Sequence, residues 1–154
     1  LSDLAAACVY EDQSGPLAER LMQEGFDSPR WHLDTAVEVI PDDRVQLRQR
    51  LHRYLEDGVD IVVTTGGTGV GPRDFTPEVV REVSDKEIPG IMEAIRVKFG
   101  ATLPNALLSR SVATVARETV LYALPGSVKA VHEYLGEILC TTEHLLRMLH
   151  GLGH

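Results

Sequence analysis

The stretch from Thr64 to Glu78 combines several glycines with hydroxyl, basic and acidic side chains, which are residue types that bind phosphate groups. Its sequence is TTGGTGVGPRDFTPE, and it follows the apolar run Val59, Ile61, Val62 and Val63. Glycines permit positive φ angles and leave backbone N–H groups accessible to a ligand, which is usually phosphate. We therefore expect a buried strand that runs into an active-site loop.

The spacing of the glycines excludes the two commonest phosphate-binding loops. Gly71 stands five residues after Gly66, as in a P-loop, but Pro72 follows it where that loop has Lys and then Ser or Thr. Gly67 and Gly69 are followed by Pro72 where a dinucleotide-binding loop has its third glycine. The loop therefore belongs to another class.

A helix start follows the loop. Thr76 is placed to cap a helix, with Pro77 at its first position and Glu78 in its first turn. Asp74 then has no capping role. Asp74 is either a loop acid that bonds its own backbone or a functional carboxylate.

Periodicity and turn residues predict alternating helices and strands along the chain. We expect helices over 16–25, 43–57, 77–83, 89–99 and 127–149, and strands over 31–40, 60–65, 112–116 and 119–123. Such alternation indicates a three-layer α/β/α sandwich with a mostly parallel sheet. Ligands of such sheets bind beyond the carboxyl ends of the strands. Asp42, the glycine loop with Asp74, and Gly126-Ser127 each follow a predicted strand, so we expect them to share one edge of the sheet.

Composition limits the class of partner. The chain has 154 residues and a formal net charge of −8, from 15 basic and 23 acidic residues. This length fits one domain, and a surface of this sign disfavours nucleic acid. A small phosphorylated ligand is not excluded, because local dipoles, one or two basic side chains and a divalent cation can hold it.

No apolar run approaches the roughly 18–20 residues that span a bilayer, and no basic and then apolar leader is found. We therefore expect a soluble, cytoplasmic protein that does not bind membranes. Cys8 and Cys140 lie far apart without metal-ligand spacing, so we expect reduced thiols on small buried or half-buried side chains. The six histidines show no metal-ligand pairing and are expected to be solvated or packing residues.

Thr-Thr-Gly-Gly-Thr-Gly followed by Arg-Asp-x-Thr-Pro-Glu resembles the signature of the molybdopterin adenylyltransferases. These are the MogA/MoaB-type proteins of molybdenum-cofactor biosynthesis, to which the G domain of gephyrin also belongs. Four further segments resemble the family's other motifs in chain order: Ser2-Asp3 with Asp12-Gln13-Ser14-Gly15-Pro16, Ile40-Pro41-Asp42, Leu108-Ser109-Arg110, and Leu124-Pro125-Gly126-Ser127. Five ordered motifs cover nearly the whole chain and imply the MogA-like fold, as a single molybdopterin-binding domain over residues 1–154.

The resemblance implies transfer of AMP from ATP to the terminal phosphate of molybdopterin, with release of pyrophosphate. It implies Asp42 and Asp74 as catalytic residues and as ligands of Mg²⁺, which prefers carboxylate oxygens. From local sequence alone, Asp42 could instead cap the helix that begins near Asp43.

Pterin or nucleotide contacts are implied for residues of all five motifs, with Ser127 equally suited to be a helix cap. The implied binding residues are Ser2, Asp3, Ser14, Gly15, Thr65, Gly66, Gly67, Thr68, Gly69, Ser109, Arg110, Pro125, Gly126 and Ser127. The family has Arg after Ser-Asp where this chain has Leu4, which puts one polar contact in doubt.

The family opens with a buried strand before Ser-Asp, whereas only Leu1 precedes Ser2 here. We expect residues upstream of Leu1, because removing a central parallel strand would expose apolar faces of both neighbours. A compact sheet with a gap beside strand 60–65 would instead indicate a sheet without that strand.

Two other functions stay open. A MoaB-type relative could bind pterin without transferring AMP, although the presence of both Asp42 and Asp74 favours catalysis. An oligomeric domain of this type could also act as a scaffold, as in gephyrin. The resemblance further implies a homo-oligomer, a trimer or a hexamer.

Overall fold

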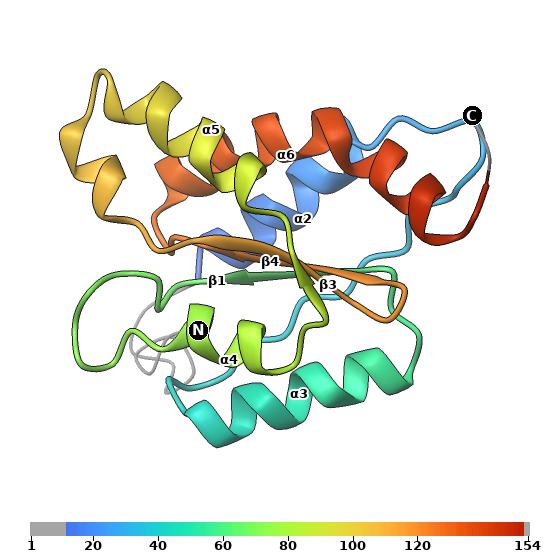
Figure 1. Cartoon of the computed structure of the whole chain (residues 1–154), viewed down its shortest axis with the longest axis horizontal. Helices are drawn as coiled ribbons and strands as arrows, with labels where there is room; N and C mark the ends of the chain where they lie inside the picture. The colour runs from blue at the N-terminus through green and yellow to red at the C-terminus, as the bar shows by residue number, and fades with distance from the viewer. Residues whose placement is uncertain (1–11, 153–154) are drawn as a thin grey trace.

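The computed structural model describes residues 12–152 of the chain. The elements follow in the order α2 (Ser14–Gly25), α3 (Arg44–Glu56), β1 (Ile61–Thr65), α4 (Thr76–Glu82), β2 (Lys86–Glu87), α5 (Pro89–Gly100), a 3₁₀ turn η1 (Pro104–Leu108), β3 (Val112–Ala116), β4 (Thr119–Leu124) and α6 (Val128–Leu149). Helices α2, α5 and α6 cover one face of the sheet, and α3 and α4 cover the other (Figure 1). The predicted three-layer α/β/α sandwich is confirmed.

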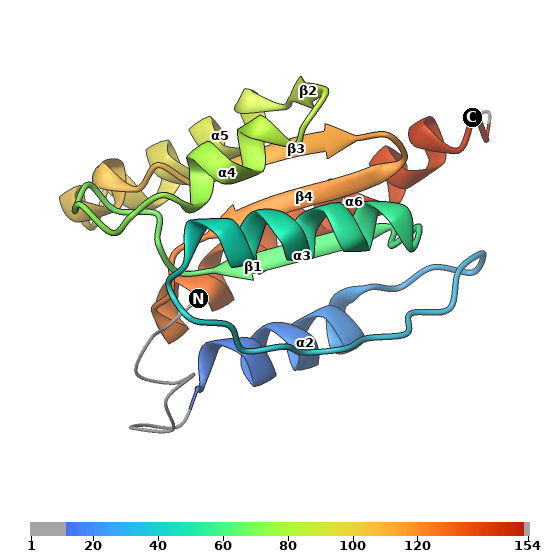
Figure 2. The ribbon, with the colours of Figure 1, turned by 90° about the horizontal axis from the view of Figure 1, so that it is seen from below.

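The sheet has the strand order β1-β4-β3-β2 and is mixed (Figure 2). Only β1 and β4 pair in parallel, with Ile61 opposite Val120 and Thr65 opposite Leu124. The β3–β4 and β2–β3 pairs are antiparallel. The sheet is therefore less parallel than we expected from the sequence, because only Arg117 and Glu118 separate β3 from β4, and so short a turn joins antiparallel neighbours.

Strand β4 shows how the sheet builds two cores. Val120, Tyr122 and Leu124 face the cluster with α2, α5 and α6, whereas Leu121 and Ala123 face the cluster with α3 and α4. All six residues of the strand are buried. Because side chains alternate between the faces of a strand, a strand covered on both sides is apolar throughout.

The helix starts differ in how well the sequence predicted their capping residues: Ser127 was among the expected caps, whereas Asp43 was not. Asp43 accepts a hydrogen bond from the backbone N–H of Gln46 at 2.8 Å and caps α3. Ser127 accepts one from Ala130 at 3.3 Å and caps α6. The prediction that Thr76 caps α4 is wrong, because Thr76 is the first residue of that helix and its hydroxyl has no partner.

The segment 31–40 was predicted to be a strand, and the structure shows none there. It runs as an extended chain between α2 and α3 (Figure 2). Its apolar alternation has no strand beside it: Val37 is 44% exposed and Val39 is 42% exposed. A strand needs a hydrogen-bonded neighbour, and none of the described strands pairs with this segment.

A cavity of about 890 Å³ lies between this segment, β1, α2 and α3. It occupies the side of β1 away from β4, where the resemblance places the family's first strand. Among residues 12–152 the sheet therefore has a gap beside β1, which is what the alternative without that strand predicts. Residues upstream of Leu1 stay a prediction.

The helices also bear on membrane spanning and on the state of Cys140. None of the described helices is long and apolar enough to cross a membrane. Cys140 is a free thiol, as expected, but it is exposed, and the prediction of a buried or half-buried side chain is wrong for it. Its Sγ–H donates to the carbonyl of Gly136 on the outer side of α6.

Candidate active site

Asp42 and Asp74 lie together although they are far apart in the sequence. They line one cavity of about 260 Å³ with Gly67, Gly71, Pro72 and Arg73. Asp74 follows the end of β1, as the strand-end rule expects. Asp42 follows the segment 31–40, which is not a strand, and nevertheless reaches the same edge of the sheet. Because Asp43 caps α3, the alternative that Asp42 is the helix cap is not supported.

Two glycines of the loop make room for the loop's own acid. A Cβ atom on Gly69 would stand 2.8 Å from Oδ2 of Asp74, and one on Gly71 would stand 2.9 Å from the same oxygen. The N–H of Gly71 donates to that Oδ2 at 2.8 Å, and the N–H of Asp74 donates to the Gly71 carbonyl at 3.0 Å. Asp74 thus bonds its own loop, as the simpler interpretation predicted, while its carboxylate also lines the cavity.

The start of the loop is held by a third glycine. Gly67 has a φ of +65°, and a Cβ atom there would stand 2.3 Å from Oγ1 of Thr76. The N–H of Thr76 donates to the Gly67 carbonyl at 3.1 Å, which ties the first residue of α4 to the loop. Gly67 therefore sits where neither a side chain nor an ordinary φ would fit.

Helix α2 starts beside the end of β1. The hydroxyls of Ser14 and Thr65 lie 3.1 Å apart. Asp12 accepts hydrogen bonds from the backbone N–H groups of Ser14 and Gly15, both at 3.1 Å, and so satisfies the first donors of the helix. Asp12 was absent from the predicted site residues, although an Asp two residues before Ser14, with Pro16 following, is a recognisable helix start.

The end of β4 approaches the same place. A Cβ atom on Gly126 would stand 3.1 Å from the Cα of Gly66, so the two loops pack backbone against backbone. The N–H of Gly66 donates to the carbonyl of Leu124 at 2.9 Å. Ser127 caps α6, which is one of the two roles that the sequence allowed. Gly126 lines the larger cavity beside β1 together with Ser14, Gly15 and Thr65.

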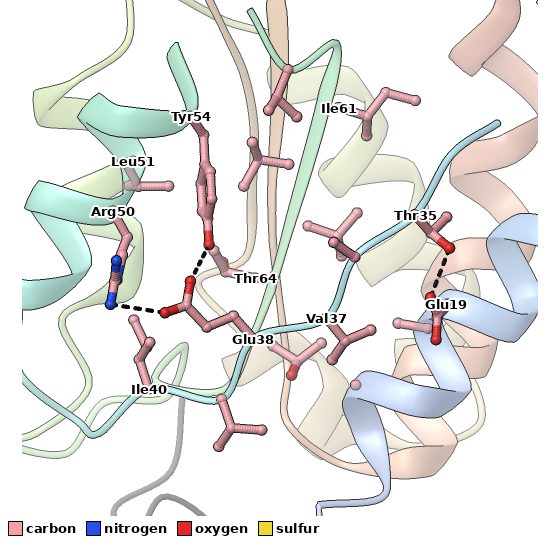
Figure 3. Close-up of a pocket in the computed structure, with 18 of the residues that line it drawn as sticks. Glu19, Thr35, Val37, Glu38, Ile40, Arg50, Leu51, Tyr54, Ile61 and Thr64 are labelled. Carbon is pink, nitrogen blue, oxygen red and sulfur yellow. Dashed lines mark hydrogen bonds and ion pairs between the residues drawn. The ribbon is translucent and has the colours of Figure 1, made fainter. Parts of the chain in front are cut away.

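The larger cavity reaches the small one through Asp42, which lines both. Figure 3 shows its wall opposite α2, where Tyr54 donates to Glu38 at 2.6 Å and Arg50 contacts the other carboxylate oxygen at 2.9 Å. Burial, followed by the hydrogen bond to Glu38, raises the pKa of Tyr54 to about 12. Tyr54 therefore stays a neutral donor at physiological pH.

The remaining predicted residues are placed differently. Ser109 and Arg110 line neither of these two cavities. The hydroxyl of Ser109 lies 2.7 Å from that of Ser111. The guanidinium of Arg110 donates to the Gly69 carbonyl of the glycine loop. Thr68 is buried, and Ser2 and Asp3 lie outside the described residues. Arg73, absent from the predicted site residues, lies beside both acids at the small cavity.

Comparison with known proteins shows the family of the chain. The model of the molybdenum-cofactor biosynthesis family, described as "Probable molybdopterin binding domain", matches residues 3–145. The molybdopterin adenylyltransferase of Haemophilus influenzae is 38% identical over 136 residues, which is 88% of this chain and 68% of that protein. The chain belongs to this family.

Solved structures of family members show the same fold. A structure of MogA is similar with a TM-score of 0.86 at 35% identity, over 96% of this chain and 94% of the other. The molybdopterin biosynthesis enzyme MoaB of Thermus thermophilus has a TM-score of 0.84 at 33% identity, over 97% of this chain and 92% of the other. MogA-like and MoaB-like structures are thus about equally similar.

The donor atoms of the small cavity fit a hard divalent cation. Asp42 and Asp74 offer carboxylate oxygens, and Mg²⁺ is usually held by one or two carboxylates, with water and substrate phosphate as its other ligands. In the described part of the chain no group of three or more His, Cys, Asp or Glu side chains could hold a metal. The two acids therefore suit an ion that is shared with a phosphorylated substrate.

Proposed function

We propose that the protein is a molybdopterin adenylyltransferase that uses Mg²⁺-ATP. The observation that carries this proposal is the meeting of Asp42 and Asp74 at one cavity, beside a glycine loop. The family and the relative from Haemophilus influenzae support the substrate class.

The reaction is an in-line displacement at the α-phosphorus of ATP. An oxygen of the terminal phosphate of molybdopterin forms a bond to that phosphorus, the bond to the bridging oxygen breaks, and pyrophosphate leaves with the electron pair. No covalent bond to the protein is needed, so positioning and charge neutralisation are the main tasks of the site. Mg²⁺, when bound, supplies positive charge to the phosphate oxygens.

The side chains divide these tasks. Asp42 and Asp74 would hold the cation from two separate segments and so fix it relative to both loops. Arg73, at the same cavity, places a permanent positive charge where phosphate would lie. The N-terminus of α6, a helix of 22 residues, begins just after Gly126 and favours an anion there.

Contacts to pterin or nucleotide are proposed for the predicted binding residues other than Arg110, and some of these residues line the two cavities. Ser14, Gly15, Thr65 and Gly126 line the larger cavity, and Gly67 lines the smaller one. The other proposed contacts are those of Ser2, Asp3, Gly66, Thr68, Gly69, Ser109, Pro125 and Ser127. A homo-oligomer is also proposed from the resemblance, and exposed apolar side chains such as Val97 and Leu107 are available for it.

A second candidate function is pterin binding without AMP transfer. It is favoured by the MoaB structure, which is about as similar to this chain as MogA is. The assay that follows separates the two functions, because both bind pterin and only one forms a new phosphoanhydride.

The test is incubation with molybdopterin, ATP and MgCl₂, followed by chromatography of the pterin and measurement of pyrophosphate. We expect equimolar adenylylated pterin and pyrophosphate from the wild-type protein. Asp42→Asn and Asp74→Asn should each lower turnover by about 100-fold or more, because each removes a charged ligand of the cation. The melting temperature should change little, since Asn keeps an oxygen that can accept the Gly71 N–H.

The matched control is Asp43→Asn, one residue from Asp42. Asparagine caps helices as well as aspartate does, so this variant should keep both its stability and its turnover. Pterin binding without any product in the wild-type protein would contradict adenylyl transfer and favour the second candidate. Equal losses of stability and turnover in the two Asp variants would show structural roles.

A further inference from the structure

Arg110 lies just before β3 and forms four hydrogen bonds to the glycine loop and the first turn of α4. Its backbone N–H donates to the Thr68 carbonyl at 2.9 Å. Its side chain donates from Nε to the Gly69 carbonyl at 2.6 Å, from Nη2 to the Asp74 carbonyl at 2.5 Å, and from Nη1 to a carboxylate oxygen of Glu78. All four acceptors lie between the end of β1 and the first turn of α4.

The loop has few other bonds that hold its two ends together. Residues 66–75 form neither helix nor strand. The Gly71–Asp74 bonds close only a local turn, and the N–H of Thr76 to the Gly67 carbonyl closes the base. The guanidinium of Arg110 reaches carbonyls on both sides of that turn, at Gly69 and at Asp74.

We propose that Arg110 is a positioning residue, which clamps the glycine loop and thereby holds the Asp74 carboxylate at the cavity that it shares with Asp42. The guanidinium binds the carbonyl of the residue whose side chain lines the cavity, so it fixes the backbone from which that carboxylate projects. The claim that Arg110 orders the loop does not depend on the proposed function, whereas the effect of Arg110 on turnover rests on that function.

The geometry distinguishes this role from the phosphate contact that the sequence suggested. Three of the five N–H donors of the guanidinium are already used by protein oxygens in three directions. The side chain is 32% exposed and lines neither of the two cavities. A planar, forked donor can serve two carbonyls and a carboxylate at once, which the single ammonium group of lysine cannot do with the same geometry.

The first test measures the loop without requiring any activity. Amide hydrogen exchange, followed by NMR on the full chain, reports the protection of the Gly71 and Asp74 N–H groups. In Arg110→Ala we expect both amides to exchange at least about tenfold faster, with the amides of β4 unchanged. The matched control is Arg96→Ala, because the hydrogen bonds of Arg96 within the described part of the chain go to the carbonyls of Ser109 and Ser111 and not to residues 66–75.

Unchanged exchange at Gly71 and Asp74 in Arg110→Ala would overturn the proposal, as would an equal increase in Arg96→Ala. Should Arg110→Ala fail to fold, Arg110→Lys gives the same measurement with a smaller increase expected. An Arg110→Lys protein whose loop is as protected as that of the wild type would also count against the clamp.

The second test uses turnover, if the wild-type protein forms adenylylated pterin. A clamp that acts through Asp74 predicts a lowered kcat in Arg110→Ala with little change in the KM for ATP. Its effect should largely disappear in the Asp74→Asn background, because both changes remove one function. A raised KM for ATP and additive losses would show a direct phosphate contact. A wild-type protein without product would refute the proposed function and leave the exchange test decisive.

Discussion

Three glycines of the glycine loop stand against side chains from the loop and from the start of α4. Gly69 and Gly71 stand against the Asp74 carboxylate, and Gly67 stands against the Thr76 hydroxyl. The sequence suggested that these positions are glycine so that a ligand can approach the backbone. The structure adds a second reason, which is that the loop must fold tightly around its own acid.

This reason can be measured at Gly67. Alanine there takes up a positive φ and places its Cβ 2.3 Å from Oγ1 of Thr76. Gly58→Ala is the matched control, because Gly58 has a φ of +71° and would meet nothing within 4 Å. We expect Gly58→Ala to lower the free energy of unfolding by about 1–2 kcal/mol, and Gly67→Ala to lower it by about 1–3 kcal/mol more, in urea denaturation.

Thr76 provides the check on that interpretation. Thr76→Ala removes the Oγ1 that a new Cβ at Gly67 would meet, so in the Gly67→Ala background it should recover part of the lost stability. Equal losses for Gly58→Ala and Gly67→Ala would contradict the steric argument. They would leave the positive φ as the whole cost.

Among the helices and strands, the sequence predicted those that depend on the local spacing of apolar residues. Leu47, Leu51 and Leu55 recur at helical spacing and are the buried face of α3, which Asp43 caps. The segment 31–40 has an equally clear alternation but forms no strand, because a strand also depends on a neighbour, which periodicity cannot show. The prediction of a Thr76 cap was wrong because the first helical bond runs from the Val79 N–H to the Phe75 carbonyl, which makes Phe75 the cap and Thr76 the first helical residue.

Some features of the candidate site could likewise be predicted from the sequence, and others could not. The sequence predicted that Asp42 and Asp74 meet, but it did so by treating 31–40 as a parallel strand. The two residues do line one cavity, although only Asp74 follows a strand. The role proposed for Arg110 could not be predicted from the sequence, because three of its four acceptors are backbone carbonyls, and every residue has such a carbonyl. Only Glu78 among its partners is a side chain that the sequence could have matched to it.

The contact between α3 and α4 gives a pH-dependent contribution to stability. Glu82 at the end of α4 binds Arg44 and Arg48 of α3, and the hydrogen bond from Arg44, followed by that from Arg48, holds its pKa below the ordinary value of 4.5. A lowered pKa means that the stabilisation is present above pH 4.5 and is lost as the pH falls through the lowered value. Glu82→Gln should therefore be less stable than the wild type at pH 6, and the difference should shrink at pH 3.5.

Urea denaturation at both pH values measures that difference, and Glu93→Gln on α5 is the control, since Glu93 is an exposed glutamate outside this cluster. Added salt should also reduce the difference at pH 6, because these charges are exposed and screened. A Glu82→Gln deficit that is the same at pH 6 and pH 3.5 would show that charge does not cause it.

At the scale of the whole molecule, the site depends on segments that only the sheet brings together. Asp42, the glycine loop, the start of α2 and the end of β4 converge at one end of β1. The start of α2 is bonded to β1 through the hydroxyls of Ser14 and Thr65, and the glycine loop is bonded to the end of β4 through the Gly66 N–H and the Leu124 carbonyl. Asp42 follows the extended segment 31–40, which pairs with no described strand.

That segment gives the last prediction. Among the described residues no backbone hydrogen bond joins 31–40 to β1, and the half-exposed Val37 and Val39 lie across a cavity from it. We expect their amides to exchange at least about a hundredfold faster than those of Leu121 and Ala123, which lie in the middle of the sheet. The measurement is the same NMR exchange experiment on the wild-type chain. Protection of Val37 and Val39 equal to that of β4 would show that the segment pairs as a strand after all. The alternation of its sequence would then have been the better guide, and Asp42 would be held as firmly as the loops that it faces.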